Sequence, residues 1–252
     1  MVVNHTLTQG KRLMDLTTTS DYIDLVTRDE NEEHATRSRI VELGDVAVWK
    51  LRQFDLDFSE VEHEIGIARR HAGLVLDLRG NGGGSEDTLR AILGSLMDQD
   101  VKIADRVERK ATKELVAKRQ GKPFSGKLVV LVDSASASAS ELLARVVQLT
   151  HRGTVVGDKT AGAVMESRIY EEEHGAETMF FYAYSVTEAN LIMTDGKSLE
   201  KTGVTPDELL LPTGADLAAG RDPVLAHAVA LVGGNLEAGE AGRMFPYEWP
   251  PL

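Results

Sequence analysis

Two consecutive cycles of one pattern constrain the fold of this 252-residue chain more than any other feature. In each cycle a short apolar run leads into a loop of small residues and then into apolar residues at helical spacing. The first cycle has its apolar run at Leu74–Leu78 and its loop at Arg79–Gly84, and the second has Leu128–Val132 and Asp133–Ser140. Strands that alternate with helices form a parallel sheet with right-handed crossovers. The pattern therefore predicts an α/β fold.

Further elements flank these cycles. Apolar runs and turn residues predict strands at Tyr22–Thr27, Arg37–Glu42, Val46–Arg52, Thr154–Val156, Met179–Val186 and Leu209–Leu211. A capping box of Ser59 and Glu62 predicts a helix that Gly73 ends. Asp222 and the proline after it predict an N-cap and a first turn for a helix that runs to about Leu231.

These predictions divide the chain into three parts. Residues 1–44 are polar and form an N-terminal lead-in, residues 45–235 form the core, and residues 236–252 form a tail with no predicted element. Within the core, residues 101–127 carry nine Lys and Arg residues against three acidic ones, so the net charge of this segment is positive whereas that of the whole chain is negative. A charge run of this kind favours a solvated surface helix, and the alternative is a mobile flap over the site.

Composition excludes several classes of function. The net charge of -12 opposes binding to nucleic acids and to anionic lipid surfaces. The chain has no cysteine, which excludes disulfides and a thiolate nucleophile. We expect no secretion signal and no membrane span, because no run of about 18 apolar residues occurs. The spacing of His and Glu supports no metal site, and we expect no cofactor.

The loops of the two cycles indicate where the chemistry lies. Both loops follow the carboxyl ends of parallel strands, where ligands bind, so we expect them to face each other. A run of glycines exposes backbone N–H groups, which suits a phosphate or the oxyanion of an acyl transfer, and the sequence motifs for phosphate are absent. Ser138 begins a helix, where the partial positive charge favours an attacking hydroxyl. The alternative is that Ser138 forms a capping box with Glu141 and only caps the helix.

Three segments carry a resemblance to a known family. VLVDSASASASELLA resembles the nucleophile segment of the carboxyl-terminal processing (tail-specific) proteases, and GLVLDLRGNGGG resembles their oxyanion-loop segment. DGKSLEKTGVTPDELL, at Asp195–Leu210, is similar to the closing motif of the family. The resemblance implies that Ser138 is the nucleophile and that the backbone N–H groups of Gly83 and Ala139 bind the oxyanion. It also implies a crotonase-like or ClpP-like α/β core, for which the lead-in would supply the end of a PDZ module.

The general base is where the sequence departs from that family. Gly157–Gly162 resembles a stretch of the processing proteases. In that family the lysine that acts as general base follows directly after the stretch, at the position where this sequence has Ala163. Lys159 lies in the same turn. A helix of about 12 residues and the strand that returns from it cover similar distances, so this turn lies near Ser138. Lys159 is therefore a candidate base, and the alternative is an ordinary exposed lysine.

The sequence of the same turn also resembles the tricorn-core branch of the family. The peptidases of that branch use a catalytic Ser together with His, a second Ser and Glu. The position that matches the histidine of that branch is approximately Lys50. Lys50 is a second candidate base if its side chain points into the cleft. Side chains alternate along a strand, and the sequence does not fix the face on which Lys50 lies. Glu200 matches the neighbourhood of the glutamate of that branch and would orient a base, with a surface carboxylate as the alternative. His151 lies about 18 Å from Ser138 along the intervening helix and is therefore excluded as the general base.

The leading hypothesis is a serine endopeptidase that cleaves unstructured or C-terminal segments of a peptide or protein substrate through an acyl-enzyme at Ser138. The first alternative is a non-catalytic peptide- or lipophile-binding domain that kept the fold and lost the base. A crotonase-like acyl-CoA enzyme is a further alternative, because it shares the oxyanion chemistry. The resemblance implies the cell envelope or periplasm for a longer parent, and the sequence leaves location and oligomeric state open.

Overall fold

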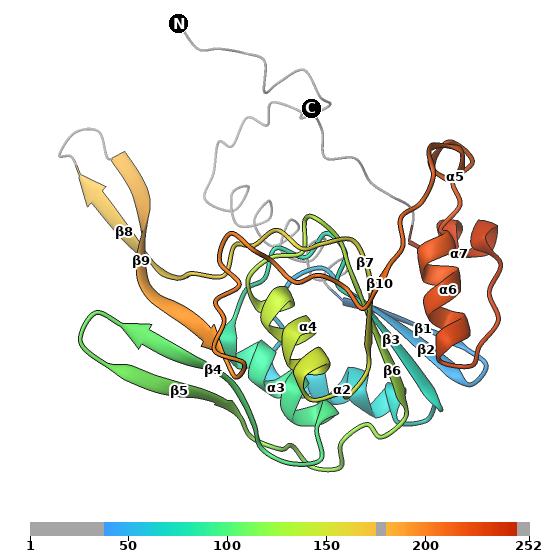
Figure 1. The fold of residues 1–252 in the computed structure, drawn as a ribbon, viewed down its shortest axis with the longest axis horizontal. Helices are drawn as coiled ribbons and strands as arrows, with labels where there is room; N and C mark the ends of the chain where they lie inside the picture. Colours follow the sequence, from blue (N-terminus) through green and yellow to red (C-terminus); the bar gives the residue numbers. More distant parts are fainter. Residues whose placement is uncertain (1–37, 175–179, 246–252) are drawn as a thin grey trace, which may run out of the picture.

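The computed structural model describes residues 38–174 and 180–245, which form two β-sheets with helices on both faces of the larger one (Figure 1). The larger sheet has the order β1 (Ser38–Leu43), β2 (Val46–Leu51), β3 (Gly73–Asp77), β6 (Lys127–Val132), β7 (Thr154–Gly157) and β10 (Glu208–Leu209). β1 is antiparallel to β2, and every other neighbouring pair is parallel. The predicted α/β fold with a parallel sheet is confirmed.

The helices divide between the two faces of this sheet. They are α2 (Phe58–Ala68), α3 (Glu86–Leu96), α4 (Ala139–Leu149), α5 (Gly214–Ala218), α6 (Pro223–Leu231) and α7 (Ala238–Met244). Helices α2, α3 and α4 share one apolar cluster with Trp49 and Leu76. Helices α6 and α7 share a second cluster with Val48 and Val75. Because side chains alternate along a strand, β2, β3, β6 and β7 each supply buried residues to both clusters.

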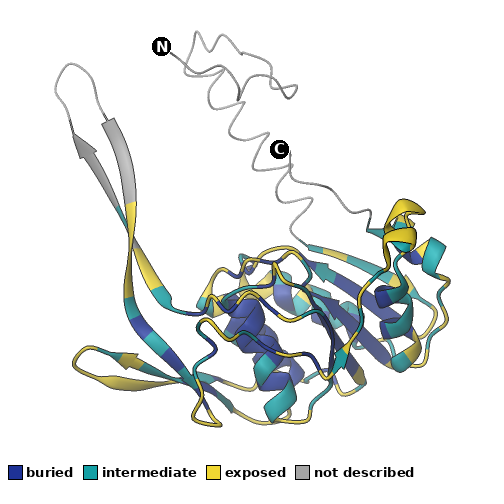
Figure 2. Cartoon of the chain, turned by 45° about the horizontal axis from the view of Figure 1, so that its top comes forward, coloured by how far each residue is buried: buried dark blue, intermediate teal, exposed yellow. Residues whose placement is uncertain are grey.

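The smaller sheet is antiparallel throughout and extends away from the core (Figure 2). Its order is β5 (Thr112–Ala117), β4 (Val101–Glu108), β9 (Phe180–Met193) and β8 (Glu166–His174). The prediction of a surface helix in the basic segment 101–127 is wrong, because β4 and β5 form a hairpin there. Its charges pair within and across the strands, as in the bond from Lys102 Nζ to Glu114 Oε1 of 2.9 Å. Cross-strand ion pairs of this kind stabilise a sheet.

Helix α2 begins earlier than predicted. Its N-cap is Asp57, whose carboxylate accepts from the N–H of Glu60 at 2.9 Å, while Glu60 accepts from the N–H of Asp57 at 2.7 Å. The predicted box of Ser59 and Glu62 is wrong, because the Ser59 hydroxyl donates to the Asp57 carboxylate at 2.7 Å. The helix ends at Ala68, and the predicted terminator Gly73 is the first residue of β3.

The ends of the chain show one confirmed element and one missed element. The N–H of Leu225 donates to Asp222 Oδ1 at 2.9 Å, so the predicted N-cap of α6 is confirmed. Helix α7 lies in the tail, for which no element was predicted. At the other end β1 pairs with β2 over its whole length, so residues 38–43 of the lead-in form the edge of the larger sheet. The predicted strand Tyr22–Thr27 lies outside the described residues.

Candidate active site

The two loops are joined by hydrogen bonds at the carboxyl edge of the larger sheet. The carbonyl oxygen of Asn81 accepts from the N–H of Ala137 and from the hydroxyl of Ser140, both at 2.9 Å. The hydroxyl of Ser136 donates to the carbonyl oxygen of Leu78 at 2.8 Å. The prediction that these loops face each other is confirmed, and the interior of the junction is buried.

Gly83 lies directly against the start of α4. A Cβ atom added at Gly83, where φ is 102°, would lie 2.6 Å from the Cβ of Ser138 and 3.1 Å from the nitrogen of Ala139. Glycine is therefore required at this position for both space and backbone conformation. The N–H of Gly83 donates to Asn81 Oδ1 at 2.8 Å, whereas the N–H of Ala139 has no acceptor within the described residues. Of the two predicted oxyanion donors, Ala139 is free and Gly83 is occupied inside its own loop.

Ser138 has a strained backbone at the N-terminus of α4. Its φ of 54° and ψ of -117° are uncommon for a residue other than glycine, and such strain concentrates at functional sites. The side chain is half-buried. The N–H of Glu141, which a purely capping serine would satisfy, donates to the carbonyl oxygen of Ser138 at 2.9 Å. In return the N–H of Ser138 donates to Glu141 Oε2 at 3.0 Å, so the predicted pairing of Ser138 with Glu141 as a capping box is present beside the strained backbone.

Glu141 is the residue whose importance the sequence understated. Its carboxylate is completely buried and accepts four hydrogen bonds. The donors are the hydroxyl of Thr160 at 2.5 Å and the N–H groups of Gly162 at 2.8 Å, Ala163 at 2.9 Å and Ser138 at 3.0 Å. A buried charge needs such partners. Glu141 thereby fastens Ser138 to the turn that follows β7, and no pattern in the sequence distinguishes it from an ordinary capping glutamate.

The turn that follows β7 contains two of the positions considered from sequence. Lys159 is exposed, and its ammonium group forms no ion pair within the described residues. Ala163 is also exposed, and its carbonyl oxygen accepts from the N–H of Ser138 at 2.9 Å. The position at which the resemblance implies a lysine base is thus adjacent to Ser138, and here its side chain is a methyl group.

Glu200 braces the same turn from another segment. Its Oε2 accepts from the N–H of Val164 at 2.9 Å and from the N–H of Met165 at 3.2 Å. The structure therefore places this carboxylate directly after Ala163, where it holds the backbone. Charge-assisted bonds to backbone N–H groups are stronger than neutral ones.

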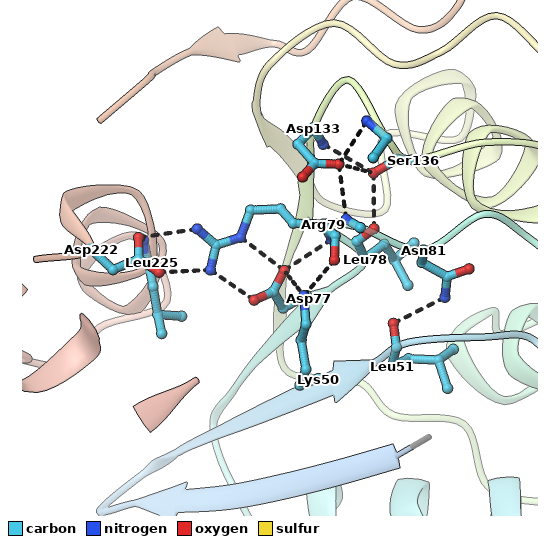
Figure 3. A network of polar contacts seen from close by, with 12 residues as sticks. Lys50, Leu51, Asp77, Leu78, Arg79, Asn81, Asp133, Ser136, Asp222 and Leu225 are labelled. Carbon is cyan, nitrogen blue, oxygen red and sulfur yellow. Dashed lines mark hydrogen bonds and ion pairs between the residues drawn. The ribbon is translucent and has the colours of Figure 1, made fainter. Parts of the chain in front are cut away.

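The structure does not bring Lys50 to Ser138. Lys50 lies two residues after Val48 and so on the same face of the sheet, which packs against α6, whereas α4 lies on the opposite face. Its ammonium group donates to Asp77 Oδ1 at 3.2 Å and to the carbonyl oxygen of Arg79 at 2.5 Å (Figure 3). Burial lowers the pKa of Lys50, and the attraction of Asp77 partly opposes that change. Lys50 is a member of a buried charge network beneath the glycine loop.

Asp77 lies at the centre of that network. Burial would raise the pKa of this carboxyl, but the charges of Arg79 and Lys50 and the hydrogen bonds from Arg79 outweigh burial and hold the pKa well below its usual range. A carboxyl group with a lowered pKa in the folded state stabilises the fold above its pKa in the unfolded chain. That contribution is lost as the pH falls toward the folded pKa.

We therefore expect acid to destabilise the protein through Asp77. The free energy of unfolding from urea titrations should fall as the pH drops from about 5, through the unfolded pKa of about 3.9, to about 2. Asp77→Asn should be less stable than the wild type at neutral pH and should lose less stability over that window. An equal loss in both proteins would mean that other carboxyl groups cause the acid sensitivity.

Two absences concern only the described part of the chain. Within residues 38–174 and 180–245, no group of three His, Asp or Glu side chains is arranged to hold a metal ion. None of the helices in those ranges has the length and apolar character that a membrane crossing needs.

The fold and the site define a class of protein: an α/β core of the ClpP/crotonase kind in which a serine at the start of a helix faces a glycine loop. The model of the family described as Peptidase family S41 matches residues 45–210. The chain belongs to this family of serine-type peptidases, and the resemblance to processing and tricorn-type proteases is confirmed.

Individual relatives support this assignment. The carboxyl-terminal-processing protease of Synechocystis is 29% identical over 78% of this chain and 46% of its own length. The putative tricorn protease homolog 2 of Streptomyces coelicolor is 30% identical over 77% of this chain and 16% of its own length. Among solved structures, the photosystem II D1 C-terminal processing protease is 26% identical, with a TM-score of 0.55 over 68% of this chain and 45% of that chain.

The tricorn protease shows the same fold, with a TM-score of 0.56 and 19% identity over 84% of this chain and 19% of that chain. The present chain spans less than half the length of these relatives.

Proposed function

We propose that the chain is the peptidase core of an endopeptidase that cleaves unstructured or C-terminal peptide segments through an acyl-enzyme at Ser138. The observation that carries this proposal is the close approach of Gly83 to Ser138, with the free N–H of Ala139 beside them. A hydroxyl and a backbone N–H without an acceptor thus lie together at the N-terminus of one helix. This supports the proposal, because acyl transfer uses a nucleophile beside hydrogen-bond donors for the oxyanion.

In the proposed reaction, Ser138 Oγ attacks the carbonyl carbon of the scissile peptide and loses its proton to a base. The N–H of Ala139 donates to the developing oxyanion. The N–H of Gly83 becomes a second donor when it exchanges its bond with Asn81 Oδ1 for the oxyanion. Protonation of the leaving amine releases the first product, and water then hydrolyses the acyl-enzyme.

Lys159 is the base we propose, because its turn is the one that contacts Ser138 through Ala163. A lysine becomes a better base when it loses water, and a peptide that covers this exposed turn would remove water from it. Lys50 is paired with Asp77 on the other face, which favours a supporting role for it. Glu200 would keep the turn in place.

The proposal predicts that a fluorophosphonate probe adds one covalent mass to the wild type, because such probes capture activated serine nucleophiles. Ser138→Ala should abolish this labelling. Ser134→Ala is the matched control, since Ser134 is an exposed serine of the same loop, and it should be labelled like the wild type. Lys159→Ala should slow labelling about a hundredfold and Lys50→Ala much less.

A second candidate function is a peptide- or lipophile-binding domain without catalysis. It is favoured by two observations: the methyl side chain of Ala163 next to Ser138, and the engagement of the Gly83 N–H with Asn81. Absence of labelling of the wild type at any pH from about 6 to 10, the range that a perturbed lysine spans, would favour this candidate. A crotonase-like acyl-CoA enzyme would instead be stabilised by coenzyme A thioesters in a thermal-shift assay.

A further inference from the structure

We propose that Asp222 and Arg79 are positioning residues through which helix α6 holds the glycine loop in its working conformation. This inference rests on the proposed function for its catalytic consequence. The family model ends at residue 210, so it assigns nothing to Asp222 or to α6. Figure 3 shows the guanidinium group of Arg79 between Asp222 on one side and Asp77 on the other.

The geometry of this contact is that of a bidentate clamp. Arg79 donates to Asp222 Oδ1 at 3.0 Å and to Oδ2 at 2.8 Å. It also donates from Nε to Asp77 Oδ1 at 2.9 Å and from a terminal nitrogen to Asp77 Oδ2 at 2.8 Å. The Arg79 and Asp222 side chains are only 19% and 15% exposed, so water screens the pair little. A guanidinium group held by two carboxylates in this way has one orientation.

The backbone of Arg79 is fixed by the same network. Its N–H donates to Asp77 Oδ1 at 3.0 Å, and its carbonyl oxygen accepts from Lys50 Nζ. The next residue, Gly80, donates its N–H to Asp133 Oδ1 at 2.9 Å. Both ends of the first peptide unit of the loop are therefore anchored to charged groups.

Asp133 continues the connection into the nucleophile loop. The same Oδ1 accepts from the N–H of Ala135 at 3.1 Å and lies 3.1 Å from the hydroxyl of Ser136, which shares its single proton between this oxygen and the carbonyl oxygen of Leu78. From Gly80 the chain passes through Asn81 to Gly83, which touches Ser138. A movement of Arg79 at the base of the loop would thus be transmitted to the oxyanion donors, where small misplacements reduce reaction rates strongly.

Asp222 performs two tasks that one substitution separates. Its Oδ1 caps α6 by accepting from the N–H of Leu225, and both oxygens accept from Arg79. Asparagine is as good an N-cap as aspartate, but it lacks the charge and the second acceptor. Asp222→Asn therefore keeps the helix and weakens the clamp.

The experiment compares amide hydrogen exchange in the segment Arg79–Gly84 with exchange in α6, and measures the rate of fluorophosphonate labelling at Ser138. We expect Asp222→Asn to raise exchange in the segment about tenfold, with exchange in α6 unchanged, because local opening follows the loss of local contacts. Labelling should slow by a similar factor. Arg79→Lys, which leaves the cap of α6 intact but cannot bond both carboxylates, should have the same effect.

Asp216→Asn is the matched control. Asp216 is 14% exposed, pairs with Arg221 and lies in α5, without a contact to the glycine loop. It should change neither exchange in the loop nor labelling. Unchanged loop exchange in both Asp222→Asn and Arg79→Lys would overturn the proposal. The exchange readout needs no catalysis, so an unlabelled wild type would refute the peptidase proposal while leaving the test of the clamp intact.

Discussion

Replacing Glu141 with glutamine should destabilise the protein by about 3 kcal/mol and nearly abolish labelling of Ser138. The carboxylate accepts four hydrogen bonds in a completely buried site. A carboxamide keeps one acceptor oxygen and replaces the other with an NH₂ group, which only donates. That NH₂ group would face the donors that now bond to the replaced oxygen, either Oε1 or Oε2. The N–H of Gly162 or that of Ala163 would then be left without a partner. The turn would be held to Ser138 mainly by the bond from the Ser138 N–H to the carbonyl oxygen of Ala163.

Urea unfolding followed by circular dichroism gives the stability, and the labelling rate gives the state of the site. Glu60→Gln is the matched control, because Glu60 occupies the equivalent N3 position of α2 and accepts a hydrogen bond from the N–H of Asp57. The Glu60→Gln substitution should lower the free energy of unfolding by less than about 1 kcal/mol. A Glu141→Gln variant as stable as Glu60→Gln would show that the four bonds do not fasten the turn.

Ala163→Lys should raise the rate of fluorophosphonate labelling about a hundredfold. The carbonyl oxygen of Ala163 accepts from the N–H of Ser138, and the side chain is exposed, so a lysine at this position has room to approach the hydroxyl. The resemblance to the processing proteases implies a lysine base at this position. The gain should increase with pH, because only a neutral amine accepts the proton of Ser138.

Two variants control for this result. Ala163→Met adds a side chain of similar length without an amine and should leave labelling at the wild-type rate. Ala161→Lys places the amine two residues earlier in the same exposed turn and should also have little effect. Labelling of Ala163→Lys no faster than that of Ala163→Met would mean that the site is not arranged for a lysine base.

The strand, loop and helix cycles were predictable because each apolar run is bounded by unmistakable turn residues. The face of Lys50 was not predictable. β2 is buried on both sides, with Val46, Ala47, Val48 and Trp49 all inside, so it lacks the alternation of apolar and polar residues that reveals orientation. The hairpin of β4 and β5 was missed for a related reason, since its many charges obscured the buried positions such as Ile103 and Leu115.

In the site, the sequence could indicate Ser138, Gly83 and Ala139 because they lie in contiguous motifs. It could not indicate that Glu141 binds a turn some twenty residues later, because that contact depends on how β7 returns beside β6. The clamp of Arg79 and Asp222 spans 143 residues of sequence and was likewise beyond any local pattern. Long-range polar contacts are set by tertiary structure, and a local motif carries no record of them.

The strand order of the smaller sheet indicates the order in which the chain folds. Its outer pairs, β4 with β5 and β8 with β9, are neighbours along the chain, so each hairpin closes a short loop. Its central pair joins β4 to β9, and β6, α4 and β7 lie between them in sequence. Closing so long a loop costs more chain entropy than closing a hairpin. We therefore expect the two hairpins to form early and the sheet that unites them to assemble only after the second half of the core has folded.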